Sequence, residues 1–260
     1  MIMNHLFHSF IVGITTALAF SAASAADTES LLAKPGKLLF EDDFSRSTMA
    51  PKWTTGKGSY FIEDGVAKLV EDRSADHGPA MKAAPRFPYK DIVAEYSIKP
   101  EASKVCHIEM KDRSYKGSHV GHIATVSITT VSLKLSDYKL GVMKNEYYDK
   151  LGDTKLSGEE KQKIKDSLNA FAPEFPIQLD PARWHRVRIE LVGDEMLVSI
   201  DGTPAGYLKS EGISHPTKDT FEISTRGKAT LLDNVKVWEA ESSPTWSARR
   251  AAVLAALPKP

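Results

Sequence analysis

Residues 105–112, VCHIEMKD, carry three side chains with acid–base or ionic chemistry at alternate positions. Successive side chains of a β-strand point to opposite faces, so a strand here places His107, Glu109 and Lys111 on one face. An imidazole beside a carboxylate is suited to proton transfer, and an ammonium can hold an anionic group of a substrate. We predict that these three residues are catalytic; the alternative is a solvated face with ordinary charge pairs between strands.

Five further residues are candidates for binding a substrate near this face. Residues 120–136 predict two more strands with a turn near Thr129, which would bring polar side chains beside the first strand. Flat aromatic rings complement the apolar face of a sugar, although two adjacent tyrosines could equally anchor an inserted helix to the core. A histidine before a proline indicates either the rim of a groove or a polar turn. The predicted substrate-binding residues are His122, Lys134, Tyr147, Tyr148 and His215.

Composition and spacing exclude some classes of protein. The chain has 260 residues with 34 Lys+Arg and 34 Asp+Glu, and it lacks a strongly basic run, so no nucleic-acid partner is expected. His119 and His122 are three residues apart and would point to opposite faces of a strand, which argues against zinc. Cys106 is the only cysteine, so packing alone must stabilise the fold. It shares a face with Ile108 and Met110 and is predicted to be buried.

The clearest structural signal lies at residues 184–202, WHRVRIELVGDEMLVSIDG. Apolar and polar residues alternate along both halves, which is the period of a half-buried strand. Gly-Asp at 193–194 and Asp-Gly at 201–202 are tight-turn pairs, so the segment predicts two antiparallel strands followed by a third. Trp184 at its start and Trp238 near the end of the domain are predicted to be core anchors.

Short predicted strands fill most of the remaining chain, with one interruption. Residues 221–225 are predicted to pair with residues 229–238. The interval from about 141 to 180 differs, because Ser157 and Glu160 form a capping box that opens a helix predicted over residues 158–172.

A second helical pattern, at residues 247–257, predicts a short C-terminal helix that docks on the body. The fold class predicted is therefore all-β, a two-sheet antiparallel sandwich or barrel with one inserted helix and a tail helix. We assign residues 26–240 to the β-domain, with the insertion at about 141–180, and residues 241–260 to the tail.

Residues 1–25 predict a secretory signal peptide. The apolar run at residues 10–20 is too short to cross a bilayer comfortably, and residues 23–25, Ala-Ser-Ala, match a cleavage pattern. The mature protein would then begin at Ala26 without a membrane span and would be secreted or periplasmic. The alternative is a signal retained as a membrane anchor, since residues 1–9 contain no lysine or arginine.

Three segments together resemble a known fold family. They are residues 41–44 (EDDF) followed by Trp53, the strand pair at 184–202, and residues 233–238 (DNVKVW). The chain resembles concanavalin A-like jelly rolls, distantly those of laminin G and glycoside hydrolase family 16, and most closely the 3-keto-disaccharide hydrolase domain group. The resemblance implies a jelly-roll sandwich and a secreted protein that acts on glycosides by hydrolysis or elimination.

The same resemblance implies two features of the site. Family 16 catalysis requires an E-x-D-x-x-E strand, and no such motif occurs here, so a retaining glucanase of that type is not expected. Several such domains hold a structural calcium, which would implicate Asp43 or Glu41 together with Asp233. The alternative is that these acids are exposed charges or turn residues. No other cofactor is expected.

Three functions remain open from the sequence, and a carbohydrate or polysaccharide is the expected partner in the first two. The first is a carbohydrate-active enzyme in which His107 or Glu109 transfers a proton while Lys111 and Lys134 position the sugar. The second is a lectin-like binding module without catalysis. The third is a structural envelope protein that assembles through its C-terminal helix.

Overall fold

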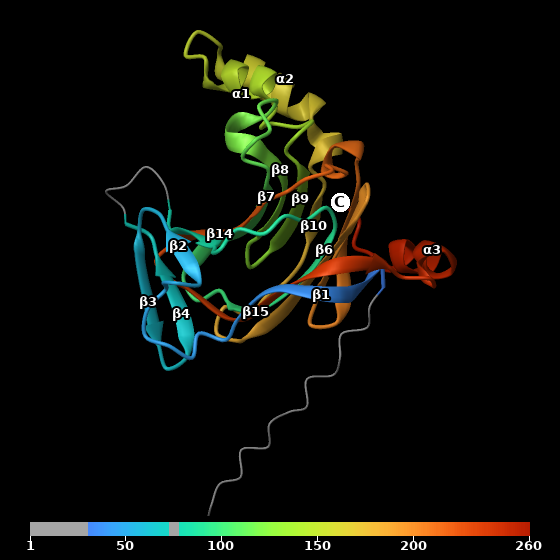
Figure 1. Ribbon diagram of the computed structural model, residues 1–260. Coiled ribbons are helices and arrows are strands. Elements are labelled where there is room, and N and C mark those ends of the chain that lie inside the picture. Colours follow the sequence, from blue (N-terminus) through green and yellow to red (C-terminus); the bar gives the residue numbers. More distant parts are fainter. Residues whose placement is uncertain (1–30, 73–77) are drawn as a thin grey trace, which may run out of the picture.

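The computed structural model of the protein describes residues 31–72 and 78–260, so the predicted signal peptide lies outside the described residues. Two antiparallel sheets form a sandwich, which confirms the predicted fold class (Figure 1). Sheet A has the order β13-β12-β11-β6-β15-β4-β3, with β1 also paired to β15, and sheet B has the order β10-β9-β8-β7-β14-β5-β2. None of the helices in the described ranges is long and apolar enough to cross a membrane.

The elements have the following bounds. Sheet A contains β1 (Ala33–Asp42), β3 (Ser59–Glu63), β4 (Val66–Val70), β6 (Ile92–Lys99), β11 (His185–Val192), β12 (Glu195–Ile200), β13 (Thr203–Lys209) and β15 (Thr230–Ser242). Sheet B contains β2 (Trp53–Thr55), β5 (Ala80–Ala83), β7 (Ser103–Lys111), β8 (His122–Ile128), β9 (Ser132–Asp137), β10 (Glu174–Pro176) and β14 (Thr220–Gly227). The helices are α1 (Asn145–Gly152), α2 (Gly158–Ser167) and α3 (Trp246–Ala256), with short 3₁₀ turns η1 (His119–Gly121), η2 (Asn169–Phe171) and η3 (Glu211–Ile213).

The two sheets bury their apolar faces against each other. Cys106, Ile108 and Met110 of β7 point into this core together with Val187 and Ile189 of β11. The predicted alternation of β7 is therefore confirmed, and its polar residues lie on the outer face of sheet B. Burial raises the pKa of the Cys106 thiol to about 12, so this thiol stays protonated and unreactive.

Tight turns set the register of sheet A. Asp64-Gly65 joins β3 to β4, and Asp201-Gly202 joins β12 to β13. Both residues of each pair have positive φ, at 52° and 76° in the first turn and 51° and 81° in the second. This geometry matches the twist of the strands and favours Asp-Gly, and the turn predicted at residues 201–202 is confirmed.

One predicted strand pairing is wrong. Residues 221–225 belong to β14, which pairs with β7 and β5 in sheet B, whereas residues 230–242 form β15, which pairs with β1, β4 and β6 in sheet A. The turn after Gly227 therefore carries the chain from one sheet to the other. A short polar turn is compatible with either connection, and the sequence pattern of the two strands does not distinguish them.

The predicted role of two tryptophans is also wrong. Trp184 is 41% exposed, and Trp238 is half-buried outside the main core. Side chains two residues apart along a strand point to the same face. Trp184 lies two residues before Arg186, and Trp238 lies two residues after Lys236, so both indoles point to the outer face of sheet A. The aromatic part of the core is instead built around Trp53, whose ring packs edge-on against Phe40 at 4.8 Å.

The insertion between β9 and β10 contains two helices, although one was predicted. The capping box of α2 is present, since the Glu160 amide donates to Ser157 Oγ at 3.2 Å and the Ser157 amide donates to Glu160 Oε2 at 2.8 Å. The helix ends at Ser167, earlier than predicted, and η2 follows it. The additional helix, α1, lies beside α2 at one end of sheet B (Figure 1). Neither helix has a fully buried residue.

The tail helix α3 is present as predicted and covers part of the outer face of sheet A (Figure 1). Trp246 packs against Leu32 and Leu197 in a second, smaller hydrophobic cluster. Arg250 Nε donates to Glu195 Oε1 at 2.7 Å, which ties the helix to β12. The apolar side of α3 is thus occupied by its own chain.

A buried ionic network lies next to this cluster. Arg188 of β11 contacts both Glu95 of β6 and Glu190, and all three residues are at most 8% exposed. The Glu190 carboxylate also accepts hydrogen bonds from the backbone amides of Leu32 and Ala33, at 2.5 and 2.9 Å. The network therefore fastens the start of β1 to the centre of sheet A.

Removal of the Glu190 carboxylate should destabilise the fold strongly. Glu190→Ala removes one buried partner of the Arg188 guanidinium and leaves the backbone amides of three residues, 31 to 33, without their acceptor. It is expected to lower the free energy of unfolding by about 3–5 kcal/mol. Urea denaturation followed by tryptophan fluorescence measures the change. Glu159→Ala, which breaks the exposed Glu159–Lys163 pair of α2, is the control and should change stability by less than about 0.5 kcal/mol. Equal effects of the two substitutions would contradict this role of the network.

Candidate functional site

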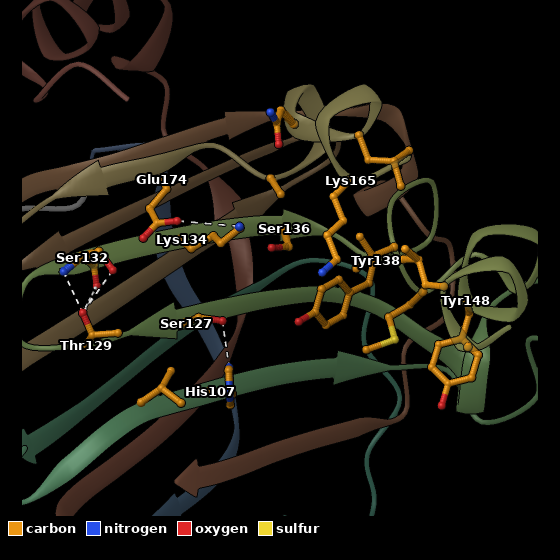
Figure 2. A pocket seen from close by; sticks show the side chains of 18 residues that line it. His107, Ser127, Thr129, Ser132, Lys134, Ser136, Tyr138, Tyr148, Lys165 and Glu174 are labelled. Atoms are coloured by element: carbon orange, nitrogen blue, oxygen red, sulfur yellow. Dashed lines mark hydrogen bonds and ion pairs between the residues drawn. The ribbon is translucent and has the colours of Figure 1, made fainter. Parts of the chain in front are cut away.

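A cavity of about 780 Å³ lies on the outer face of sheet B, beside the insertion (Figure 2). Its floor is formed by β7, β8 and β9, one side by β10, and a wall by α1, α2 and η2. The floor contributes mainly hydroxyl, imidazole and ammonium groups, and the insertion contributes Leu151, Leu168 and an aromatic ring. A space of this size and mixed lining is suited to a small molecule or to part of a polymer chain.

Strand register brings five polar side chains into one row, and all of them except Ser224 line the cavity. His107 lies opposite Ser127 of β8 on one side and opposite Ser224 of β14 on the other. Ser127 lies opposite Lys134 of β9, which in turn lies opposite Glu174 of β10. Lys134 and Glu174 are ion-paired at 3.7 Å. Only the pairing of distant strands could create this row.

His107 is the titratable group at the centre of the row. Its Nδ1 is hydrogen-bonded to Ser127 Oγ at 2.8 Å, which fixes the ring on the cavity floor (Figure 2). Burial lowers the pKa of His107, against a smaller opposing effect of the Glu109 carboxylate, so the imidazole is neutral at pH 7. In the tautomer in which Nδ1–H donates to Ser127 Oγ, Nε2 keeps the lone pair that can accept a proton.

The two other predicted catalytic residues belong to an ionic cluster beside the cavity. The Lys111 ammonium lies 2.5 Å from Glu109 Oε2 and 3.0 Å from Glu222 Oε1 of β14. Lys82 of β5 lies 3.6 Å from the second oxygen of Glu222. These four charges balance, and three of the four side chains are almost completely buried. None of the four lines the cavity.

His122 and Tyr138 connect the ionic cluster to the cavity. His122 Nδ1 lies 3.8 Å from Glu109 Oε2 and has no hydrogen-bond partner among the described residues. Burial, assisted by the Lys111 ammonium, lowers the pKa of His122 to about 3. Tyr138 packs edge-on against His122 at 5.5 Å and lines the cavity. Burial and the Glu109 charge raise the pKa of Tyr138 to about 12, so its hydroxyl keeps its proton.

The wall of the cavity is held by an aromatic stack. The Tyr148 ring of α1 lies 3.7 Å from the His119 ring, with an angle of 11° between their planes, and Tyr148 borders the cavity. Lys165 of α2 extends from the wall, and Figure 2 shows its ammonium turned toward Tyr138 over the sheet. Tyr147 instead contacts Lys144 and does not border the cavity.

His215 lies away from the cavity, in a buried turn. Its Nε2 is 2.9 Å from Asp112 Oδ2, and its ring packs edge-on against Tyr115 at 5.0 Å. The carboxylate of Asp112 also accepts from the Thr217 hydroxyl at 3.0 Å. These contacts are those of a polar turn residue, the alternative considered from the sequence.

The acids proposed as calcium ligands each have a local partner. Asp43 accepts a hydrogen bond from the Ser45 amide at 3.0 Å, and Asp233 accepts from the Asn234 amide at 2.7 Å. Across residues 31–72 and 78–260, no three histidine, cysteine, aspartate or glutamate side chains are grouped so as to hold a metal ion. Calcium binding at these acids stays a prediction.

The structure thus divides the predicted residues. His107, Lys134 and Tyr148 line the cavity, while Glu109, Lys111 and His122 form the cluster next to it; Tyr147 and His215 lie elsewhere. The proposed catalytic and binding roles stay predictions.

Three residues of this region were not anticipated: Tyr138, Lys165 and Glu222. One signal for Lys165 was available, since it lies three residues before Leu168 on the same helical stripe. Glu222 meets Glu109 only through the pairing of β14 with β7, which the sequence pattern did not predict.

Comparison with known proteins shows a similarity of fold. No family model matches the chain, and no curated protein matches its sequence. A non-specific endo-β-1,3(4)-glucanase from family GH16 superimposes with a TM-score of 0.52 at 11% identity, over 81% of this chain and 96% of that one. The catalytic domain of an endo-1,3-β-glucanase (laminarinase) from Thermotoga petrophila gives 0.51 at 13% identity, over 80% and 100%. A protein of unknown function with a galectin-like fold from Bacillus subtilis gives 0.51 at 13%, over 82% and 100%.

The fold is that of the concanavalin A-like jelly rolls. This confirms the fold implied by the three sequence segments. At these identities the likeness concerns architecture, and the site must be judged from its own residues.

The low pKa of His122 should make stability fall in acid. The unfolded chain binds a proton at the ordinary histidine pKa of 6.5, whereas the folded protein does so only near 3, so protonation favours unfolding as the pH falls from 6.5. Between pH 6 and 4 the unmodified protein should therefore lose stability faster than His122→Gln, by up to about 1.4 kcal/mol per pH unit. Urea denaturation at several pH values measures both slopes. An imidazole NMR signal of His122 that titrates near pH 6.5 would contradict the assignment.

Proposed function

We propose that the protein is an exported carbohydrate-active enzyme that cleaves glycosidic bonds in the cavity over sheet B. His107 is the residue proposed to transfer the proton. The observation that carries this proposal is a neutral imidazole, fixed through Nδ1, on the floor of a 780 Å³ cavity. The solved glucanases that share the fold are consistent with a glycan substrate.

The lining of the cavity is suited to sugar hydroxyls and sugar faces. Hydroxyl groups project from three neighbouring floor positions, Ser127, Ser132 and Ser136, and can exchange hydrogen bonds with a glycan. The Tyr148 ring on the wall offers a flat apolar surface for a pyranose.

His107 is better placed than Glu109 to act on a bound sugar. Glu109 is held by Lys111 in the ionic cluster and does not border the cavity. Burial lowers the pKa of His107 and keeps the imidazole neutral, so a free ring nitrogen can accept a proton from a bound sugar. Glu109 then acts at a distance, because its charge opposes the lowering of the His107 pKa.

The sequence resemblance to the 3-keto-disaccharide hydrolase group adds a mechanism to this proposal. In a 3-keto-glycoside, the carbonyl makes the hydrogen on the adjacent ring carbon acidic. A neutral base such as His107 can remove that proton, and the electron pair of the C–H bond forms a carbon–carbon double bond as the bond to the glycosidic oxygen breaks. The protonated imidazole then returns the proton to the leaving oxygen, which completes the elimination. The proposed enzyme thus needs one well-placed base and no pair of catalytic carboxylates, in agreement with the absence of the family 16 motif.

Two other functions fit parts of the structure. A lectin-like module would use the same hydroxyl groups and Tyr148 without chemistry, and binding without product release would identify it. A structural envelope protein would need an available assembly surface, whereas α3 uses Trp246 and Arg250 to contact its own chain.

Substitution of His107 tests the enzymatic proposal. The mature protein is incubated with neutral polysaccharides and 3-keto-glycosides, and binding is followed by calorimetry and product release by mass spectrometry. His107→Gln should lower kcat by about 10²–10⁴-fold while the dissociation constant of the glycan changes less than about threefold. Its circular dichroism and melting temperature report whether the fold is kept.

Glu109→Gln is the companion variant, because it removes the other proposed acid–base group. It should lower activity less than His107→Gln does and should alter the pH dependence of kcat/KM, since its charge raises the pKa of His107. A folded His107→Gln protein with unchanged turnover would refute the assignment of the base.

A further inference from the structure

The charge of the cavity indicates more about the substrate than its shape does. Two ammonium groups and one carboxylate line it. Lys134 is paired with Glu174 at 3.7 Å, which leaves the Lys165 ammonium as an excess positive charge. No ion pair or hydrogen bond joins that ammonium to another residue in the described ranges.

The position of Lys165 makes this charge relevant to the site. It extends from the last turn of α2, while its helix neighbours Leu168 and Asn169 face the same cavity. In Figure 2 its ammonium reaches over the sheet on the side of Tyr138. Lys163, two residues earlier on α2, behaves differently, since it forms an exposed pair with Glu159 at 2.9 Å. A cation directed into a cavity without a counter-ion favours an anionic ligand.

Three groups of complementary chemistry therefore face one space: a neutral base, a protonated phenol and an unpaired cation. His107 is neutral because it is buried, and Tyr138 keeps its proton because burial and the Glu109 charge oppose ionisation. They come from different strands, His107 from β7 and Tyr138 from the residue that follows β9. A sugar ring bound between His107 and Tyr138 would present one set of atoms to the imidazole and another to the phenol.

We propose that the substrate is an acidic glycan, a chain containing hexuronate units, whose carboxylate binds Lys165 and which is cleaved by β-elimination between His107 and Tyr138. This inference rests on the proposed function and specifies its substrate class. A 3-keto-glycoside and a uronide share one requirement, an acidic hydrogen beside a carbonyl carbon. They differ in charge, and Lys165 matches the charged one.

The reaction balances without water, oxidant or metal. His107 Nε2 removes the proton from C5 of the uronate, and the electron pair of that C–H bond becomes the C4=C5 double bond. The C4–O4 bond breaks, and the Tyr138 hydroxyl donates its proton to the leaving oxygen. The Lys165 ammonium stabilises the negative charge that accumulates on the carboxylate as C5 loses its proton. The proton on His107 then returns to the Tyr138 oxygen through solvent.

The test compares matched polymers. Soluble polyuronides are offered beside the same polymers with their carboxylates chemically reduced to alcohols, and beside 3-keto-glycosides. The expected product absorbs in the ultraviolet, because its new double bond is conjugated with the carboxylate, and it contains no oxygen from isotopically labelled water. The reduced polymers should stay intact. Incorporation of solvent oxygen into the product would show hydrolysis and overturn the inference.

Variants then assign the groups. Lys165→Gln should lower kcat/KM for the polyuronide by about ten- to a hundredfold, as expected for loss of a charged hydrogen bond. Lys163→Gln, on the same helix, is the control and should stay within about twofold of the unmodified protein. Tyr138→Phe should lower kcat by about 10²-fold or more with little change in KM. Undiminished activity of Lys165→Gln contradicts carboxylate binding there.

The outcomes separate this inference from the proposed function. If 3-keto-glycosides are cleaved and polyuronides are not, the inference fails and the enzymatic role of His107 stands. If polyuronides bind but no glycan of the panel is cleaved, the protein is a binding module and both proposals fail.

Discussion

The fold depends on the close packing of two sheets that no covalent cross-link holds together. With Cys106 as the only cysteine, the apolar faces of sheets A and B must supply the stability, at about 25 cal/mol for each Å² that they bury. This packing decides which side of every strand points inward. Because Cys106, Ile108 and Met110 pack in the core, the alternate residues of β7 must point outward. The outward row of His107, Glu109 and Lys111 is therefore a direct consequence of the core.

The two outer faces are used in opposite ways. Sheet A covers its outer face with helix α3 and with the network in which Arg188 and Glu190 hold the start of β1. Sheet B leaves its polar face open on the side of β8 and β9, and the insertion turns that face into a cavity. Ionic groups are buried in both places. Glu190 of sheet A binds backbone amides of the same chain, whereas His122 Nδ1, beside the ionic cluster of sheet B, has no hydrogen-bond partner among the described residues.

Local patterns in the sequence were sufficient for local structure. The period-two alternation of β7 and β11, the Asp-Gly turn at residues 201–202 and the capping box at Ser157 each depend on neighbouring residues, and each was predicted correctly. Features that depend on distant segments were missed. The transfer of the chain between sheets after Gly227, the meeting of Glu222 with Glu109, and the position of Tyr138 over the floor all require the strand order, which a single sequence does not specify. The outward position of Trp184 could have been predicted, because it lies two residues before Arg186 and so shares its face.

The insertion has a consequence for how such a protein can change. Helices α1 and α2 contain no fully buried residue, yet they supply Tyr148, Lys165 and much of the cavity wall. Sequence drift or exchange of residues 141–173 would therefore reshape the cavity wall while sparing the hydrophobic core of the sandwich. The arrangement separates the part of the chain that keeps it folded from the part that shapes the cavity, and an engineer could exploit that separation by grafting alternative walls onto an unchanged scaffold.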